Sequence, residues 1–205
     1  MGLLRLHPLA QCELAGRPSR FLETLVQRDA RNLTRIRSLD ALPRLLTLAA
    51  GQSARLLNVT ELASPFQLSR PTIHDYVTLL ERMFLIEPLP PWHVNRLSRL
   101  VKTPKLHVGD TGVACALLGL DPAALAKDRA TLGQLLETFV LQELRRHASW
   151  HDDEIRFHHF RGLRKLKDAA GRRFVAGVVL YDGEASAPFG EGFFAVPIRA
   201  VWELR

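Results

Sequence analysis

The stretch Leu56–Pro91, LLNVTELASPFQLSRPTIHDYVTLLERMFLIEPLPP, decides the fold that the sequence predicts. Asn58 can cap the amides of a short helix in which Glu61 reaches back in the manner of a capping box. After a loop through Pro65, Ser69 can cap a second helix. The apolar side chains of that helix fall three or four residues apart in one stripe: Ile73, Tyr76, Val77, Leu80, Met83 and Phe84. The stretch therefore predicts two capped helices joined by a tight turn.

The flanking segments extend this pattern to a winged helix-turn-helix. A helical repeat that ends at Gly51 precedes the stretch, and an extended segment follows it. We expect residues 85–89 to pair with residues 106–109 as the hairpin of the wing. Helix, turn, capped helix and hairpin, in this order, are typical of a winged helix-turn-helix. Such domains bind DNA but also dock on proteins, and Asp75 on the second helix would repel phosphate, so both roles stay open.

The charge of the chain favours an acidic partner for its first half. The 205 residues carry 28 Lys and Arg against 21 Asp and Glu, a net charge of +7, and residues 1–110 hold most of the excess. The solvent side of the second helix and the loop of the wing offer side chains for phosphates and bases. These candidate contacts are Arg70, Thr72, His74, Thr78, Arg96, Arg99 and Lys102. If they bind DNA, affinity should fall steeply with salt.

The second half of the chain predicts an α/β part. A long helix over residues 132–148 places Glu137 on its apolar side, where a carboxylate is costly unless it is paired or holds a ligand. A strand follows at residues 155–160 and a basic amphipathic helix at 162–170. We expect the apolar strand at 174–181 to be buried on both faces. A strand at 193–198 then precedes a final short helix.

Several kinds of active site are missing from the sequence. It holds no GxxxxGK[ST] phosphate loop, no GxSxG elbow, no HExxH and no paired cysteines. His147 and His151 lie four residues apart near acidic residues, but solvated side chains at a helix end explain them better than a metal site. With two distant cysteines and no signal or membrane-spanning segment, the sequence predicts a cytoplasmic protein without metal or cofactor.

Five blocks of the sequence stand out in order: FLETLVQRDARNLTRI (21–36), LSRPTIHDYVTLLERMFLIEPLPPWHVN (68–95), KLHVGDTG (105–112), LLGL (117–120) and GQLLETFVLQELRR (133–146). Together they resemble the C-terminal domain of unknown function in prokaryotic AAA+-type ATP-binding proteins. In that family an ATPase domain comes first, then a winged helix, then a part similar to PD-(D/E)XK nucleases. Residues 1–14 are similar to the last strand and loop of the ATPase domain.

The chain departs from this family at the nuclease pattern. Glu137 matches the helix Glu of that pattern, but the hairpin that carries an Asp and a Glu-x-Lys has no counterpart here. Such a site needs clustered carboxylates for a divalent ion and a Lys for the attacking water. The resemblance therefore implies a pseudoenzyme in which Glu137 is vestigial, with the strands of Phe157 and Val178 paired directly.

We therefore predict an α+β protein, a winged helix-turn-helix followed by a reduced restriction-endonuclease-like α/β part. Its regions are a remnant strand and loop of a lost ATPase domain (1–20), a helical and winged-helix domain (21–110) and a reduced nuclease-like domain (111–205). The predicted function is a non-catalytic interaction or DNA-binding module, with DNA or an ATPase subunit in trans as partner and no membrane. The alternatives are a metal-dependent phosphodiesterase completed by a partner chain, a freestanding winged-helix transcription regulator, and a decaying gene product. The sequence does not determine the oligomeric state.

Overall fold

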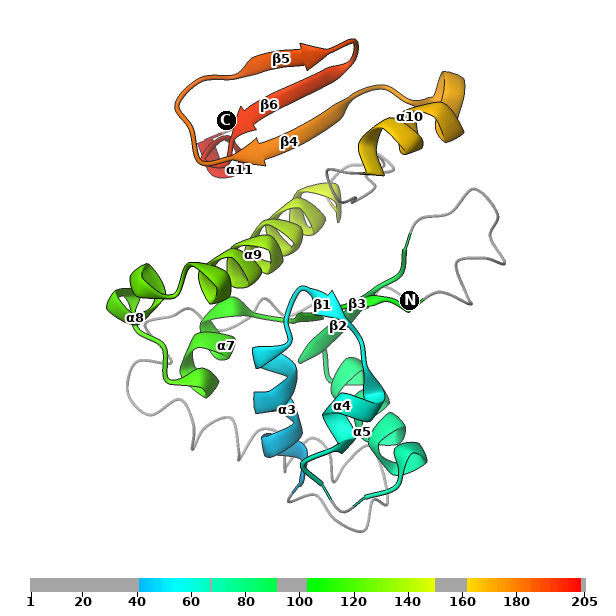
Figure 1. The fold of residues 1–205 in the computed structure, drawn as a ribbon, viewed down its shortest axis with the longest axis vertical. Helices are drawn as coiled ribbons and strands as arrows, with labels where there is room; N and C mark the ends of the chain where they lie inside the picture. The colour runs from blue at the N-terminus through cyan, green and yellow to red at the C-terminus, as the bar shows by residue number, and fades with distance from the viewer. Residues whose placement is uncertain (1–40, 67, 92–102, 150–161, 204–205) are drawn as a thin grey trace. The chain divides into compact units, whose positions relative to one another are not determined.

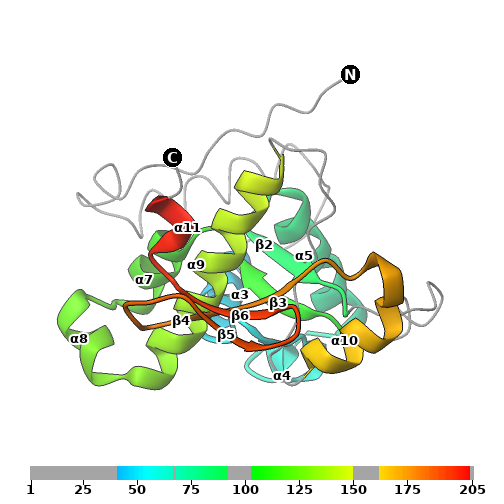
Figure 2. The ribbon, with the colours of Figure 1, turned by 90° about the horizontal axis from the view of Figure 1, so that it is seen from above.

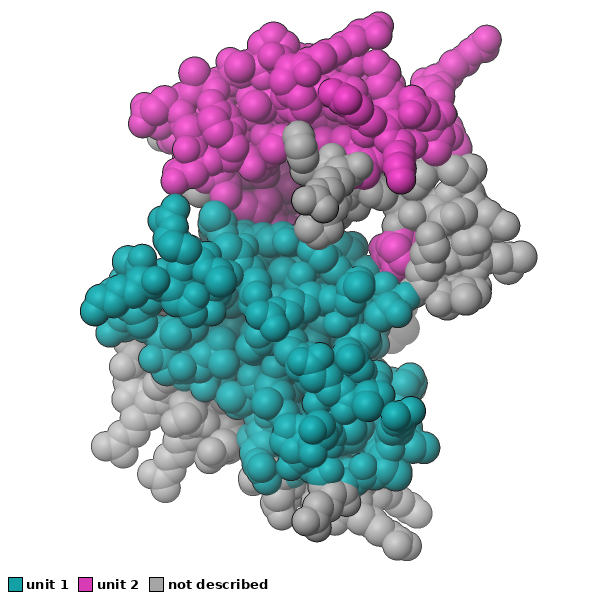
Figure 3. All heavy atoms as spheres, in the orientation of Figure 1, with its two compact units in different colours: residues 1–89, 103–139 teal, residues 90–102, 140–205 magenta. Residues whose placement is uncertain are grey.

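The computed structural model describes residues 41–66, 68–91, 103–149 and 162–203 (Figure 1). The chain divides into two compact units, residues 1–89 with 103–139 and residues 90–102 with 140–205 (Figure 3). Each unit mixes helices with a small sheet that has three strands in the described ranges. The boundary expected after residue 110 lies inside the first unit. The sequence block at 21–36 and the strand expected at 155–160 lie outside the described residues.

The first unit is built from short helices around a small sheet. Its elements are α3 (Ala41–Gly51), β1 (Arg55–Leu56), α4 (Val59–Ala63), α5 (Arg70–Arg82), β2 (Ile86–Leu89), β3 (Lys105–Val108), α7 (Thr111–Leu118), α8 (Pro122–Lys127) and the first part of α9 (Arg129–Ser149). Both predicted caps are confirmed. Asn58 Oδ1 accepts hydrogen bonds from the Thr60 and Glu61 amides, and Ser69 Oγ accepts one from the Thr72 amide.

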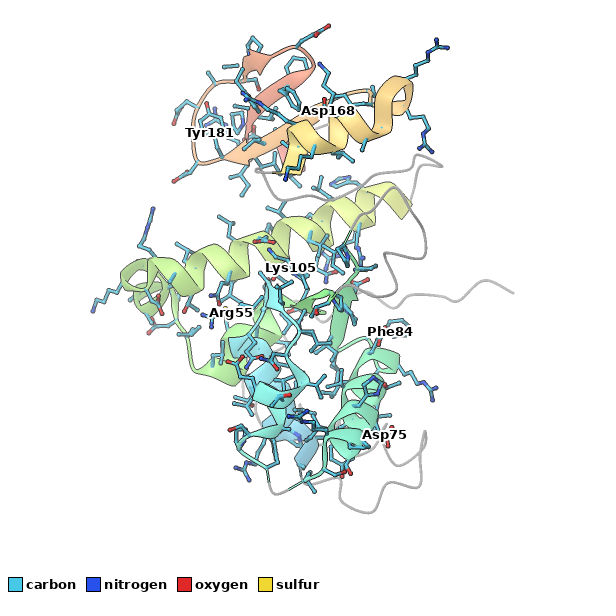
Figure 4. All side chains as sticks on the ribbon, turned by 45° about the vertical axis from the view of Figure 1, so that its right-hand side comes forward. Arg55, Asp75, Phe84, Lys105, Asp168 and Tyr181 are labelled. Carbon is cyan, nitrogen blue, oxygen red and sulfur yellow. The ribbon has the colours of Figure 1, made fainter. Side chains whose placement is uncertain are left out.

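The core of this unit lies where α3, α4 and α5 meet the sheet. Its fully buried side chains come from all of these elements and include Leu42, Leu45, Leu46, Leu62, Ile73, Leu80, Ile86 and Leu106. The stripe predicted on α5 is therefore confirmed, except at its last member. Phe84 is 56% exposed because α5 ends at Arg82 and Phe84 takes a left-handed backbone, with φ of 59°, that turns the chain into β2 (Figure 4).

The sheet of the first unit contains the predicted hairpin. Strands β2 and β3 are antiparallel, with Ile86 opposite Val108, and β1 lies on the other side of β3, so the strand order is β1-β3-β2. Gly109 follows β3, where a Cβ would lie 2.0 Å from the Phe84 carbonyl oxygen. Glycine therefore allows the close backbone approach that joins the end of β3 to the start of β2.

The second unit carries a separate sheet. Besides the last part of α9, its described elements are α10 (Leu163–Ala170), the 3₁₀ turn η2 (Gly171–Arg173), β4 (Gly177–Tyr181), β5 (Ala187–Gly190), β6 (Phe193–Pro197) and α11 (Ala200–Glu203). The order is β4-β6-β5, with β4 parallel and β5 antiparallel to β6 (Figures 1 and 2). The basic helix, the last strand and the terminal helix match the sequence prediction.

The prediction that residues 174–181 form a strand buried on both faces is wrong. The strand starts at Gly177, and Val178 is 50% exposed although its run is apolar. In the described part of the unit β4 has a strand neighbour on one side, β6, where Val178 lies opposite Phe194. Phe194 is also exposed, because side chains alternate between faces and Phe193 takes the covered one. The strand expected to contain Phe157 lies outside the described residues.

No helix within the described ranges is long and apolar enough to cross a lipid bilayer.

Candidate functional site

The outward side of α5 holds four of the seven predicted contact residues. Arg70 and His74 are exposed, while Thr72 and Thr78 are half-buried. The two threonine hydroxyls already have partners in the helix itself, because Thr72 Oγ1 lies 2.8 Å from Ser69 Oγ and Thr78 Oγ1 donates to the His74 carbonyl. Arg70 and His74 are therefore the side chains of this set that α5 offers to a partner.

The exposed charges of α5 are balanced. Arg70 and Arg82 are exposed on this helix, and so are Asp75 and Glu81 (Figure 4 labels Asp75). Such a surface does not attract a polyanion strongly by itself, because like and unlike charges cancel beyond a few ångströms. The three other predicted contacts, Arg96, Arg99 and Lys102 in the loop between β2 and β3, lie outside the described residues.

Glu137 does not lie on the apolar side of α9, contrary to the sequence interpretation. The buried side of the helix in this unit carries Leu135 and Thr138, which leaves Glu137 exposed. Its Oε1 forms an ion pair with Nζ of Lys105 on β3 (Figure 4 labels Lys105). The negative charge of the Glu137 carboxylate is thus balanced by a lysine. Within the described ranges no group of three or more His, Cys, Asp and Glu side chains could hold a metal ion.

Three buried polar side chains form a cluster that the sequence did not point to. Ser53, His107 and Thr138 have no solvent exposure, and they come from the turn after α3, from β3 and from α9. Thr138 Oγ1 lies 2.9 Å from Ser53 Oγ and 3.0 Å from His107 Nδ1. Ser53 Oγ also accepts from the Val108 amide at 3.1 Å. The cluster thus ties three elements of the first unit together through hydrogen bonds.

Only one arrangement of protons supplies a donor hydrogen for each hydrogen bond that Thr138 makes in this cluster. Thr138 donates to the Gln134 carbonyl, so its oxygen must accept from both the Ser53 hydroxyl and the His107 ring. His107 therefore carries its proton on Nδ1. Its Nε2 is buried and has no hydrogen-bond partner in the described part of the chain. A second proton on this ring would lack an acceptor there.

Burial keeps His107 neutral. Loss of solvation lowers the pKa of His107 to about 4, Glu137 opposes this effect by raising the pKa, and Lys105 adds to the lowering. Although a serine, a threonine and a histidine are together, none of them reaches the surface, so no substrate can touch them. The cluster is a structural connection between elements. Nothing in KLHV distinguished His107 from its apolar neighbours, because the partners lie 31 or more residues away along the chain.

The described residues define a mixed α+β fold with two small sheets, and comparison with known sequences places the chain in a family. The chain belongs to the family described as "Domain of unknown function (DUF8612)", whose model matches residues 10–124. That span includes the described elements from α3 to the start of α8.

The chain is also similar to two mycobacterial proteins. It is 28% identical over 124 residues to the uncharacterized proteins Rv2008c of Mycobacterium tuberculosis and Mb2031c of Mycobacterium bovis. The match covers 60% of this chain but 28% of each relative, so the chain spans less than a third of their length. No solved structure matches the chain.

Proposed function

We propose that the first unit is a winged helix-turn-helix that binds duplex DNA without catalysis, with α5 as the recognition helix and the β2–β3 hairpin as the wing. One observation carries this proposal: the order helix, strand, helix, helix, hairpin ends in a sheet of order β1-β3-β2, and α5 leaves Arg70 and His74 exposed. This is the element order of a winged helix, in which the second helix of the motif reads the major groove.

The packing of α5 supports this role. Ile73 and Leu80 are fully buried and fix one side of the helix on the core. Arg70 and His74 lie in its first turns, and the N-terminal residues of a recognition helix are those that contact base edges. A rigid helix with this part exposed holds side chains at fixed positions for a groove.

The wing supplies the positive charge that α5 lacks. Residues 90–109 contain four Lys and Arg and no Asp or Glu. One of the four, Lys105, is engaged with Glu137. We propose the other three, Arg96, Arg99 and Lys102, as phosphate contacts. We therefore assign the salt-dependent part of the affinity mainly to the wing and the orientation of the complex to α5.

The same proposal includes the wider family resemblance. We infer a relative of AAA+-type ATP-binding proteins that works in the cytoplasm beside an ATPase subunit in trans, with a reduced nuclease-like part over residues 111–205. The pairing of Glu137 with Lys105 supports a vestigial role for that carboxylate, since an ion-paired side chain is a poor start for a metal site.

Fluorescence anisotropy with a short labelled duplex tests the proposal. The full chain should bind at low salt, and log K should fall linearly with log salt. Arg70→Glu should weaken binding about tenfold, as expected for a lost contact of the recognition helix. Arg129→Glu is the matched control, because Arg129 is also an exposed arginine of this unit, at the start of α9. Equal effects of the two variants, or no binding at low salt, would reject the proposal.

Docking on a protein is the second candidate, and the mixed charge of α5 favours it. Asp75 and Glu81 would repel phosphate but could pair with basic side chains of a protein partner. The substitution Asp75→Asn separates the two candidates. It should strengthen binding to the duplex, whereas a protein interface that pairs with Asp75 should lose affinity.

A further inference from the structure

The second unit carries a dense basic segment on its surface. The eleven residues 163–173, which form α10 and η2, contain five Lys and Arg and one carboxylate, Asp168. Four of the cationic side chains are exposed, and none of these four forms an ion pair with another described residue. They are Arg164, Lys165, Arg172 and Arg173. Figure 4 shows nitrogen-tipped side chains that point outward from this end of the unit.

The fifth cation, Lys167, fixes the helix on the sheet. Its Nζ donates to the Glu191 carbonyl at 2.7 Å, lies 3.4 Å from the Glu191 carboxylate, and stands 5.5 Å from the centre of the Phe193 ring. Leu163 of the same helix is buried. Because these residues hold one side of α10, the exposed cations stay on its outer side.

An open hollow of about 360 Å³ lies between α10 and the β5–β6 turn. It is lined by Arg164, Lys167, Asp168, Phe189, Gly190, Glu191 and Phe193. Phe189 is 40% exposed and stacks on Phe193 with the ring centres 5.7 Å apart and the planes at 25°. Phe174 holds Phe193 from a second direction at 5.5 Å. The hollow thus offers a supported aromatic ring beside arginine and lysine side chains.

Cations and a supported aromatic ring suit a strand of nucleotides better than a lipid surface. A basic amphipathic helix binds membranes by inserting its apolar side. In α10 that side is not available, since Leu163 is buried and Leu166 half-buried within the unit. A single nucleic-acid strand needs no inserted apolar side chain, because its phosphates pair with cations and its bases stack on aromatic rings.

We propose that this α10 surface, Arg164, Lys165, Arg172, Arg173 and Phe189, binds single-stranded nucleic acid. The phosphates lie along the cations, and one base stacks against Phe189 in the hollow. This site is independent of the duplex-binding proposal, because the two sites share no residue and either site can fail alone.

The test measures anisotropy of the full chain with labelled oligothymidylate. The double variant Arg172→Glu/Arg173→Glu should lose about tenfold or more in affinity at low salt, and its log K against log salt should flatten by about 1.4, at about 0.7 for each lost single-strand contact. The control double variant is Lys127→Glu/Arg129→Glu, which reverses two exposed cations of the first unit.

The stacked base is tested with Phe189→Ala. This variant should bind oligothymidylate about tenfold more weakly but should bind inorganic polyphosphate, which has no bases, as the wild type does. Phe194→Ala is the matched control, because Phe194 is 41% exposed on the opposite side of the sheet from Phe193.

Four results would overturn the proposal. The α10 double variant could lose no more affinity than its control, or Arg70→Glu could abolish oligothymidylate binding while the α10 variant retains it. Phe189→Ala could weaken binding to polyphosphate and to oligothymidylate equally. Finally, the chain could bind phosphatidylserine vesicles through Arg172 and Arg173 while it fails to bind oligothymidylate.

Discussion

Acid should destabilise the first unit through His107. The ring has no solvent exposure, and burial lowers its pKa from a usual value near 6.5 to about 4. Between these two values the unfolded chain binds a proton that the folded chain refuses, so stability falls as pH falls. The contribution of the neutral His107 ring to the free energy of unfolding is complete above about pH 6.5 and is lost progressively down to about pH 4.

The size of the effect follows from the shift. A difference of roughly 2.5 between the pKa values of His107 in the unfolded and folded chain corresponds to about 3 kcal/mol in total, at 1.36 kcal/mol for each pH unit. From about pH 7 to about pH 5 the free energy of unfolding should drop by about 2 kcal/mol on account of His107 alone. Other titrating groups add their own pH dependence, so the comparison with a variant is what isolates this residue.

The assay is urea unfolding at a series of pH values. In His107→Asn the side-chain amide can still donate to Thr138 but does not titrate, so its stability curve should be flatter than that of the wild type by about 2 kcal/mol over the same range. His74→Asn is the control, because His74 is exposed on α5. If His107→Asn and the wild type lose stability in parallel as pH falls, the buried His107 ring is not the cause of the acid sensitivity.

Further substitutions test the core packing, the close backbone approach at Gly109 and the helix cap at Asn58. Leu80→Ala removes a fully buried side chain and should lower the free energy of unfolding by about 2–5 kcal/mol, whereas Leu56→Ala, at a site 63% exposed, should change it by less than about 0.5 kcal/mol in the same urea titration. Gly109→Ala places a Cβ 2.0 Å from a carbonyl oxygen and should cost about 1–3 kcal/mol in thermal unfolding, so an unchanged melting temperature would contradict the close approach. Asn58→Ala should cost about 1 kcal/mol, and Asn58→Asp, which keeps a capping oxygen, should restore most of it in a calorimetric comparison.

Local chemistry explains what the sequence predicted correctly. The caps at Asn58 and Ser69 need a side-chain oxygen two or three residues before the amides that it accepts from, so a short window contains all the information. The stripe on α5 follows from the helical period in the same way. Phe84 departs from it because the helix ends two residues earlier, and that ending depends on how the chain turns into β2.

Tertiary pairing explains what the sequence could not predict. Ser53, His107 and Thr138 are far apart along the chain, and each is ordinary in its own segment until the fold brings the three together. The same is true of Glu137, whose partner Lys105 lies 32 residues away. An apolar run such as β4 predicts a strand, but its burial depends on the number of strand neighbours that the sheet supplies.

Hydrogen–deuterium exchange of the full chain, with and without a DNA duplex at low salt, tests the central claim most directly. If α5 is a recognition helix, peptides that cover residues 70–82 should exchange more slowly when the duplex is present, while peptides from α8 and the start of α9 should not change. Unchanged exchange across residues 70–82 under conditions where the chain is saturated with duplex would contradict the account.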